Sequence, residues 1–169
     1  SVVHGKGLVH GNLKPSNLLV SDGGIVRVCD TGMPRSSQYV VNRYVQEDMG
    51  DWNILHLAFV PPELIEGQTL QPSADTYGIG VLLCHMLSGR MPFEGEPEEI
   101  MQKISSEVSP FRHIAELPLH SETKLVIETM VNRAPSWRYE DMPELIGALR
   151  GALNAILGLG AQVMTRVES

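Results

Sequence analysis

The sequence predicts a mainly α-helical fold with one short β-hairpin near its beginning. Apolar residues after position 73 recur at the spacing of a buried helix face, and two short β-prone runs flank the turn sequence Ser21-Asp22-Gly23-Gly24. With 169 residues, of which 43% are hydrophobic and 20% charged, the chain has the composition of one globular domain. We therefore expect a single helical unit with little sheet.

The hairpin is the first predicted element, with strands at 18–20 and 25–28. Gly23 and Gly24 accept the positive φ values that a tight two-residue turn demands. If these two glycines form the loop, the numbers of cross-strand partners sum to 47. Asn17 is then predicted to face Asp30.

Four helices are expected after the hairpin, at 74–88, 96–107, 121–132 and 142–157. Gly89 supplies a stop for the first of them. The segment 33–60 has little periodicity, which is typical of a surface segment. We place one domain at 1–157 and a tail at 158–169. The apolar residues from 152 onward are expected to pack on the domain; the alternative is a small docking stripe.

The overall charge and the cysteine content narrow the function classes. A net charge of -7 argues against a nucleic-acid surface, because phosphate binding needs clustered Lys and Arg. Cys29 and Cys84 are expected to be small buried thiols in a reduced compartment. No apolar run is long enough for a bilayer and no leader is visible, so we expect a cytoplasmic location without membrane contact. The missing initiator methionine indicates a fragment or a partial gene product.

Five polar motifs follow one another along the chain. They are His10-Gly11-Asn12-Leu13-Lys14-Pro15-Ser16-Asn17, Cys29-Asp30-Thr31-Gly32, Pro61-Pro62-Glu63, Ser73-Ala74-Asp75 and Arg133-Ala134-Pro135-Ser136-Trp137-Arg138. In this order they resemble motifs of the protein kinase superfamily, including its H-R-D-L-x-x-x-N, D-F-G and A-P-E sequences. The resemblance is to serine/threonine kinases and implies the helical C-terminal lobe of the kinase fold, in which 33–60 is the activation loop.

The resemblance places Asn12 where kinases carry the catalytic Asp that accepts the proton of the substrate hydroxyl. A carboxamide has no basicity near neutral pH, so this general-base function should be lost or weak. Lys14 would neutralise charge on the transferred phosphate; the alternative is an ordinary loop lysine.

Asn17 and Asp30 take the positions of the magnesium ligands in the family. Their alternatives are local: Asn17 could cap a turn, and Asp30 could cap a turn or a helix. Nothing in the chain resembles the glycine-rich loop or the lysine that bind ATP from the other lobe. ATP and Mg²⁺ are therefore expected only if the native protein includes that upstream lobe.

The remaining matches imply structural roles. His10 is expected to be a packed architectural histidine, and Asp75 belongs to the buried central helix. Glu63 and Arg138 correspond to a buried ion pair that ties the end of the activation loop to the helices. These structural residues are retained although the catalytic carboxylate is absent. This indicates a scaffold that was kept after the catalytic function was lost.

We therefore predict a pseudokinase that acts by binding a protein partner. The alternative is a fragment of an active ATP-dependent serine/threonine kinase that acts on a protein substrate. A third interpretation is a truncated gene product without independent function. The sequence names neither the partner nor the substrate.

Overall fold

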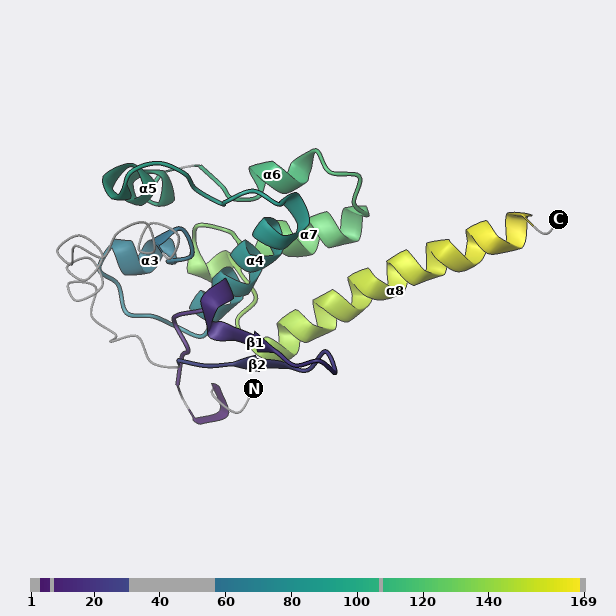
Figure 1. The fold of residues 1–169 in the computed structure, drawn as a ribbon, viewed down its shortest axis with the longest axis horizontal. Helices are drawn as coiled ribbons and strands as arrows, with labels where there is room; N and C mark the ends of the chain where they lie inside the picture. The colour runs from purple at the N-terminus through teal and green to yellow at the C-terminus, as the bar shows by residue number, and fades with distance from the viewer. Residues whose placement is uncertain (1–3, 7, 31–56, 107, 168–169) are drawn as a thin grey trace.

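The computed structural model describes residues 4–6, 8–30, 57–106 and 108–167, with the backbone alone for 159–167. Its elements are η1 (His4–Lys6), η2 (Pro15–Asn17), β1 (Leu18–Val20), β2 (Val26–Val28), α3 (Pro62–Ile65), α4 (Ser73–Ser88), α5 (Pro97–Ile104), α6 (Arg112–Ala115), α7 (Ser121–Met130), η3 (Pro135–Trp137) and α8 (Met142–Val167). Figure 1 shows a helical body with the hairpin beside it and the far end of α8 projecting as an arm. The predicted fold class, mainly α with a short hairpin, is confirmed.

Helix α4 is the centre of the body. Residues on several of its faces are buried, among them Tyr77, Gly80 and Leu82, as expected for a helix that is apolar nearly all round. It packs against α6, α7 and η3. Gly89 ends it as predicted, with φ 66° and its N–H donating to the carbonyl of His85.

Two apolar clusters fill the body. The larger surrounds α4 and includes Leu64 of α3, Ile100 of α5 and Ile114 of α6. The smaller joins α7 to the first turns of α8, and its buried members are Val126, Met130, Leu145 and Ala152. Gly80 brings α4 close to α7, because an added Cβ would lie 2.7 Å from the Cβ of Met130.

The predicted hairpin register is wrong by one residue. Leu18 pairs with Val28, so Asn17 lies opposite Cys29 rather than Asp30. Of the two adjacent glycines only Gly24 has positive φ, at 75°, whereas a type I′ turn needs positive φ at both central residues and a type II′ turn needs it at the first. Ser21 instead closes a three-residue loop, since its N–H donates to the carbonyl of Ile25.

The expected helices exist, but their ends differ. α5 ends at Ile104 and α7 at Met130, both short of the predicted 107 and 132, whereas α8 runs ten residues past the predicted 157. The helix therefore crosses the expected domain boundary, which stays a prediction. The four-residue helices α3 and α6 were not expected, because so short a segment shows no apolar period.

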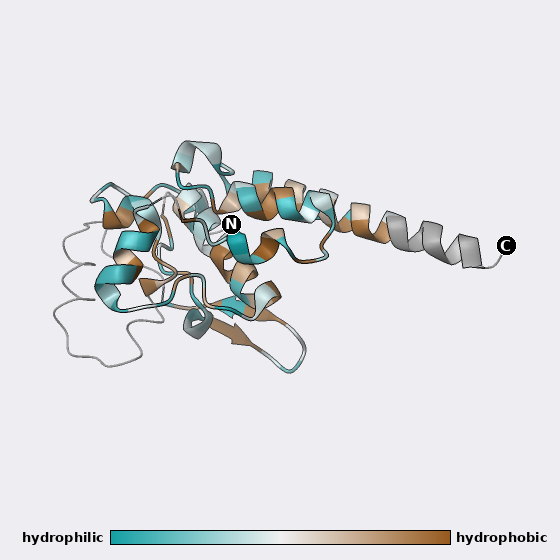
Figure 2. Ribbon diagram, turned by 90° about the horizontal axis from the view of Figure 1, so that it is seen from above, coloured by the Kyte–Doolittle hydropathy of each residue, from teal (hydrophilic) through white to brown (hydrophobic). Residues whose placement is uncertain are grey.

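Two expectations about burial are also wrong. Residues 57–60, predicted to belong to a surface segment, are all buried in the core; residues 33–56 of that segment lie outside the described part. Among the apolar residues from 152 onward whose side chains the structure describes, Ala152 is buried against the body, whereas Leu153, Ile156 and Leu157 are exposed. Figure 2 shows that the hairpin strands are hydrophobic as well.

In the described part of the chain no helix has the length and apolarity to cross a membrane.

Candidate functional site

The Asp75 carboxylate holds the main chain of the segment that contains Asn12. Asp75 lies in the first turn of α4 and is 3% exposed. Its Oδ2 accepts the N–H of His10 at 2.9 Å, and its Oδ1 accepts the N–H of Gly11 at 2.7 Å. The His4 ring donates to the same Oδ2 from Nε2 at 2.7 Å. The path of this loop is thus set by contacts that do not involve the side chain at position 12.

The His10 ring connects the loop to the end of β2. Its Nδ1 accepts the N–H of Asn12 at 3.2 Å, so the proton must be on Nε2, which donates to the carbonyl of Cys29 at 3.1 Å. Both ring nitrogens therefore form hydrogen bonds with main-chain atoms, and His10 as a whole is 5% exposed. This geometry fits an architectural residue rather than a general acid or base.

Asn17 is buried and fixes the loop from the other side. Its Nδ2 donates to the carbonyl of Asn12 at 2.8 Å, and its N–H donates to the carbonyl of Lys14 at 3.0 Å. Because the amide nitrogen is used, Oδ1 is the side-chain atom that could reach a cation. Asn12 itself is half-buried, with its N–H and carbonyl both bound, and the half-buried Lys14 immediately precedes η2.

Asp30 has an unusual backbone conformation. Its φ is 55°, in the left-handed region that non-glycine residues enter at a cost of about 1–3 kcal/mol. Asp30 is exposed and lies one residue beyond the Asn17–Cys29 pair, so the two residues occupy the same end of the hairpin. A carboxylate and an amide oxygen are ligands that magnesium accepts, with phosphate and water completing its shell. No cluster of three or more His, Cys, Asp or Glu exists among the residues described.

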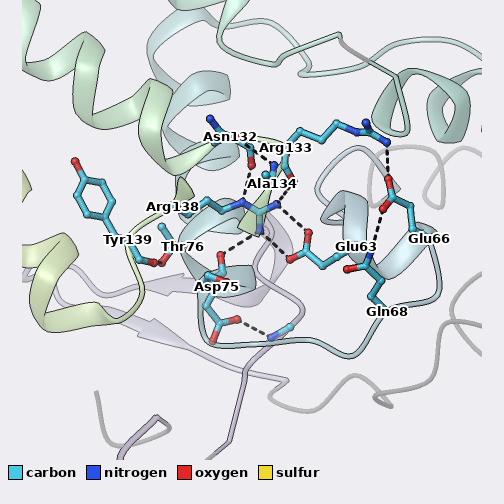
Figure 3. Close-up of polar contacts among 12 residues, drawn as sticks. Glu63, Glu66, Gln68, Asp75, Thr76, Asn132, Arg133, Ala134, Arg138 and Tyr139 are labelled. Carbon is cyan, nitrogen blue, oxygen red and sulfur yellow. Dashed lines mark hydrogen bonds and ion pairs between the residues drawn. The ribbon is translucent and has the colours of Figure 1, made fainter. Parts of the chain in front are cut away.

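Glu63 and Arg138 form a second, fully buried network. The Arg138 guanidinium binds both carboxylate oxygens of Glu63, at 2.7 and 2.8 Å, with side chains 0% and 3% exposed. Figure 3 shows this pair at the junction of three chain segments. The guanidinium also donates to the carbonyls of Ser73, Asn132 and Arg133. It therefore joins α3, the start of α4 and the segment before η3.

The ring of Tyr77 also contacts this network. The Arg138 guanidinium carbon lies 4.7 Å from its centroid, which is within cation–π range. Burial raises the pKa of the Tyr77 hydroxyl well above its ordinary value, and the nearby Arg138 only partly offsets that effect. The Tyr77 phenol is therefore neutral at physiological pH, and it adds no charge next to the Glu63–Arg138 pair.

The sequence motifs did not reveal His4, although it binds the central Asp75. His4 lies in η1, a single 3₁₀ turn that precedes the first of the motifs. No local spacing connects positions 4 and 75, which are 71 residues apart. Asp75, His10, Asn12 and Asn17 were singled out and do come together, whereas Glu63 and Arg138 meet at a separate place.

The chain has recognisable relatives among known proteins. The family model for the protein kinase domain matches residues 1–146. The chain is 30% identical over 155 residues to a Corynebacterium efficiens protein named Serine/threonine-protein kinases drp72, covering 88% of this chain and 27% of that protein. It is 31% identical over 140 residues to mouse Sperm motility kinase Z, covering 79% and 26%. The chain thus spans about a quarter of the length of such relatives. It belongs to the protein kinase family.

Proposed function

We propose that this chain is the helical lobe of a pseudokinase, a kinase-like protein that has lost most of its phosphotransfer and acts by binding a protein partner. The observation that carries the proposal is Asn12, an amide on a loop whose backbone is still held by Asp75, His10 and Asn17. The backbone at position 12 is held in place, but the Asn12 side chain supplies no basic oxygen. A positioned general base contributes a factor of about 10²–10⁴ in rate, which sets the size of the expected loss.

The geometry also supports a retained magnesium site as part of this proposal. Asn17 and Asp30 would hold the cation, and Lys14 would lie against the phosphate of a bound ATP. The cation would supply charge neutralisation on the phosphate oxygens. The strained φ of Asp30 favours this assignment, because strain of this kind is concentrated at functional sites. Nucleotide binding further requires an upstream lobe in the native protein.

Restoring the carboxylate tests the proposal directly. In the full-length native protein, Asn12→Asp is expected to raise phosphotransfer from radiolabelled ATP to a general protein substrate by at least about 10²-fold. Asn12→Gln is the matched control, since it keeps the amide and should stay at background. If the unmodified protein already transfers phosphate at the rate of its Asn12→Asp variant, the pseudokinase proposal is wrong.

The second candidate function is an active serine/threonine kinase with another proton acceptor. The retained Lys14, Asn17 and Asp30 favour it, as do the names of its kinase relatives. The same assay separates the two, because this candidate predicts high activity before any substitution. A cytoplasmic location stays a prediction under both.

A further inference from the structure

A cavity of about 230 Å³ lies beside the Glu63–Arg138 pair and is lined by residues of several helices. Its walls include Pro62 of α3, Tyr77 of α4 and Ile104 of α5, all of them buried. Val131, which follows α7 and is also buried, adds a further apolar wall. Pockets for drug-sized ligands measure about 300–1,000 Å³, so this cavity has the size for a smaller molecule.

The hydroxyl of Tyr77 is an unused hydrogen-bond donor in the lining of this cavity. Tyr77 is 1% exposed, and Arg138 contacts only the face of its ring. Within the described residues no atom accepts the proton of this hydroxyl. Buried hydroxyls normally have a partner. Because burial raises the pKa of Tyr77, the hydroxyl keeps its proton and can donate it to a molecule in the cavity.

Asn132 supplies a second donor to the same cavity. Its Oδ1 accepts the N–H of Ala134 at 3.0 Å, so Nδ2 is the end of the amide that can donate to a ligand. The hydroxyl oxygens of Ser106 and Ser109, which also line the cavity, each already accept a backbone N–H. The uncharged groups of the lining therefore offer a ligand donors rather than acceptors.

The charged residues of the lining favour a neutral ligand. Glu128 is an exposed acid of α7, and Arg133 is bound to Glu66 at 2.6 Å. An anion would meet the Glu128 carboxylate, and a cation would leave the donors of Tyr77 and Asn132 without an acceptor. A carbonyl oxygen accepts from both donors and carries no net charge.

We infer that this cavity binds a small uncharged molecule with an apolar body and a carbonyl oxygen. The carbonyl accepts hydrogen bonds from Tyr77 and Asn132, and the apolar body packs against Ile104 and Val131. This inference goes beyond the proposed pseudokinase function and does not depend on it. The same chemistry can be carried by a free molecule or by a side chain of a protein partner.

The test is saturation-transfer difference NMR on the intact native protein with two probes, acetophenone and ethylbenzene. Both have the same phenyl ring and ethyl-sized substituent, but ethylbenzene lacks the carbonyl oxygen. We expect acetophenone to bind at least about threefold more tightly, because ethylbenzene leaves both donors unpaired. Weaker or equal binding of acetophenone would overturn the inference, and so would the absence of binding by either probe, which would leave the cavity to water.

Tyr77→Phe is the decisive variant, because it removes the donor without breaking a hydrogen bond inside the protein. It should fold and unfold at the same temperature as the unmodified protein. Acetophenone binding should weaken about threefold to tenfold, with ethylbenzene binding unchanged. Tyr139→Phe is the matched control, since Tyr139 lies outside the cavity lining, and it should alter neither affinity. Unchanged acetophenone binding in Tyr77→Phe would refute the assigned contact.

A bulky residue in the lining tests the location of the site. Val108 lines the cavity and is 38% exposed, so Val108→Trp can fill the space without disturbing the core. It should abolish binding of both probes, whereas Leu125→Trp, at an exposed position outside the lining, should not. Equal effects of the two tryptophans would place binding elsewhere and contradict the inference.

A peptide probe distinguishes the two sources of the carbonyl group. It is a heptapeptide of glycines and serines with one 4-acetylphenylalanine. Competition between this peptide and acetophenone would support a side chain of a partner as the ligand, whereas binding of acetophenone alone would support a free molecule. These measurements involve no phosphotransfer, so failure of the cavity and failure of the pseudokinase proposal are separate results.

Discussion

At the scale of single residues, Arg138 has more influence on the fold than any exposed charge. It is buried, and it binds Glu63 and three carbonyls at once. Arg138→Met removes the cation and leaves the Glu63 carboxylate buried without a partner. We expect the free energy of unfolding to fall by about 3–5 kcal/mol, measured by urea denaturation.

Arg133→Met is the control for this change. Arg133 pairs with Glu66 at 2.6 Å, but the two side chains are 45% and 32% exposed, so solvent screens the pair. Its loss should cost less than about 1 kcal/mol. A double variant with Glu63→Leu and Arg138→Met should recover part of the stability. Equal costs for Arg138→Met and Arg133→Met would contradict the role assigned to the buried pair.

The second prediction at this scale concerns the Cys84 thiol. Burial raises its pKa from an ordinary 9.0 to about 12. The unfolded chain therefore loses the proton at lower pH than the folded one, and this thiol favours unfolding as the pH rises from about 9 toward 12. Below pH 9 both states keep the proton and the effect vanishes.

Labelling with a thiol reagent at pH 9 checks this expectation. In a Cys29→Ser variant, which leaves Cys84 as the single thiol of the chain, the reaction should be at least about 100-fold slower than in urea. Cys84→Ala should flatten the loss of stability above pH 9. Rapid labelling of the native Cys29→Ser variant would show that the thiol is accessible and ionised.

The residues that the sequence could predict are those that belong to motifs. Asp75, Glu63 and Arg138 were recognisable because each lies inside a short pattern, and for Glu63 and Arg138 the pattern also predicted the partner. The partners made only by the folded chain were not recognisable: His4 reaches Asp75, and the Cys29 carbonyl reaches His10, without any local spacing that connects them. Hydrogen bonds to main-chain atoms leave no side-chain signature in the sequence.

At the scale of elements, the contact between α4 and α7 depends on Gly80. A methyl group there would lie 2.7 Å from Met130 Cβ and 2.7 Å from Val131 Cγ1, closer than packed atoms allow. Gly80→Ala gains helix propensity but forces the helices apart, so we expect a net loss of about 1–3 kcal/mol. Thermal unfolding measures it.

Gly147→Ala on α8 is the matched control, because nothing lies within 4 Å of an added Cβ there. This variant should gain about 0.5–1 kcal/mol from helix propensity alone. A Gly80→Ala protein as stable as Gly147→Ala would mean that α4 and α7 tolerate separation.

Helices were predicted more reliably than their ends or the hairpin register. The spacing of apolar residues identifies a long helix. Where that helix ends depends on which local groups form hydrogen bonds with its last carbonyls. In the hairpin, the choice between a two-residue and a three-residue loop depended on the φ of Gly23, which its residue type leaves open. The loop is one residue longer than predicted, so Asn17 lies opposite Cys29 instead of Asp30.

At the scale of the whole molecule, the hairpin exposes an apolar surface that a lone lobe does not cover. Its exposed residues are Leu19, Val20, Ile25, Val26 and Val28, at 48–68% of their full area. We expect the isolated 169-residue chain to self-associate and to bind a hydrophobic dye. Size-exclusion chromatography checks this.

The double variant Val20→Lys/Val26→Glu should raise the monomer fraction, because it places opposite charges on a cross-strand pair. Leu125→Lys, an exposed apolar position on α7, is the control and should change little. A sharp monomer peak for the unmodified chain would count against an uncovered lobe surface.

The contacts of Asp75 also have a consequence for the order of folding. They join α4 to His10, Gly11 and His4 across 65, 64 and 71 residues, whereas the contacts within α4 are local. Closing such long loops costs conformational entropy before the hydrogen bonds to Asp75 can form. We expect α4 to be structured first and the loop to attach late. Amide hydrogen exchange at His10 and Gly11 should then report openings that leave α4 protected, so the part of the lobe that carries the family's chemistry would be the last to form and the first to detach.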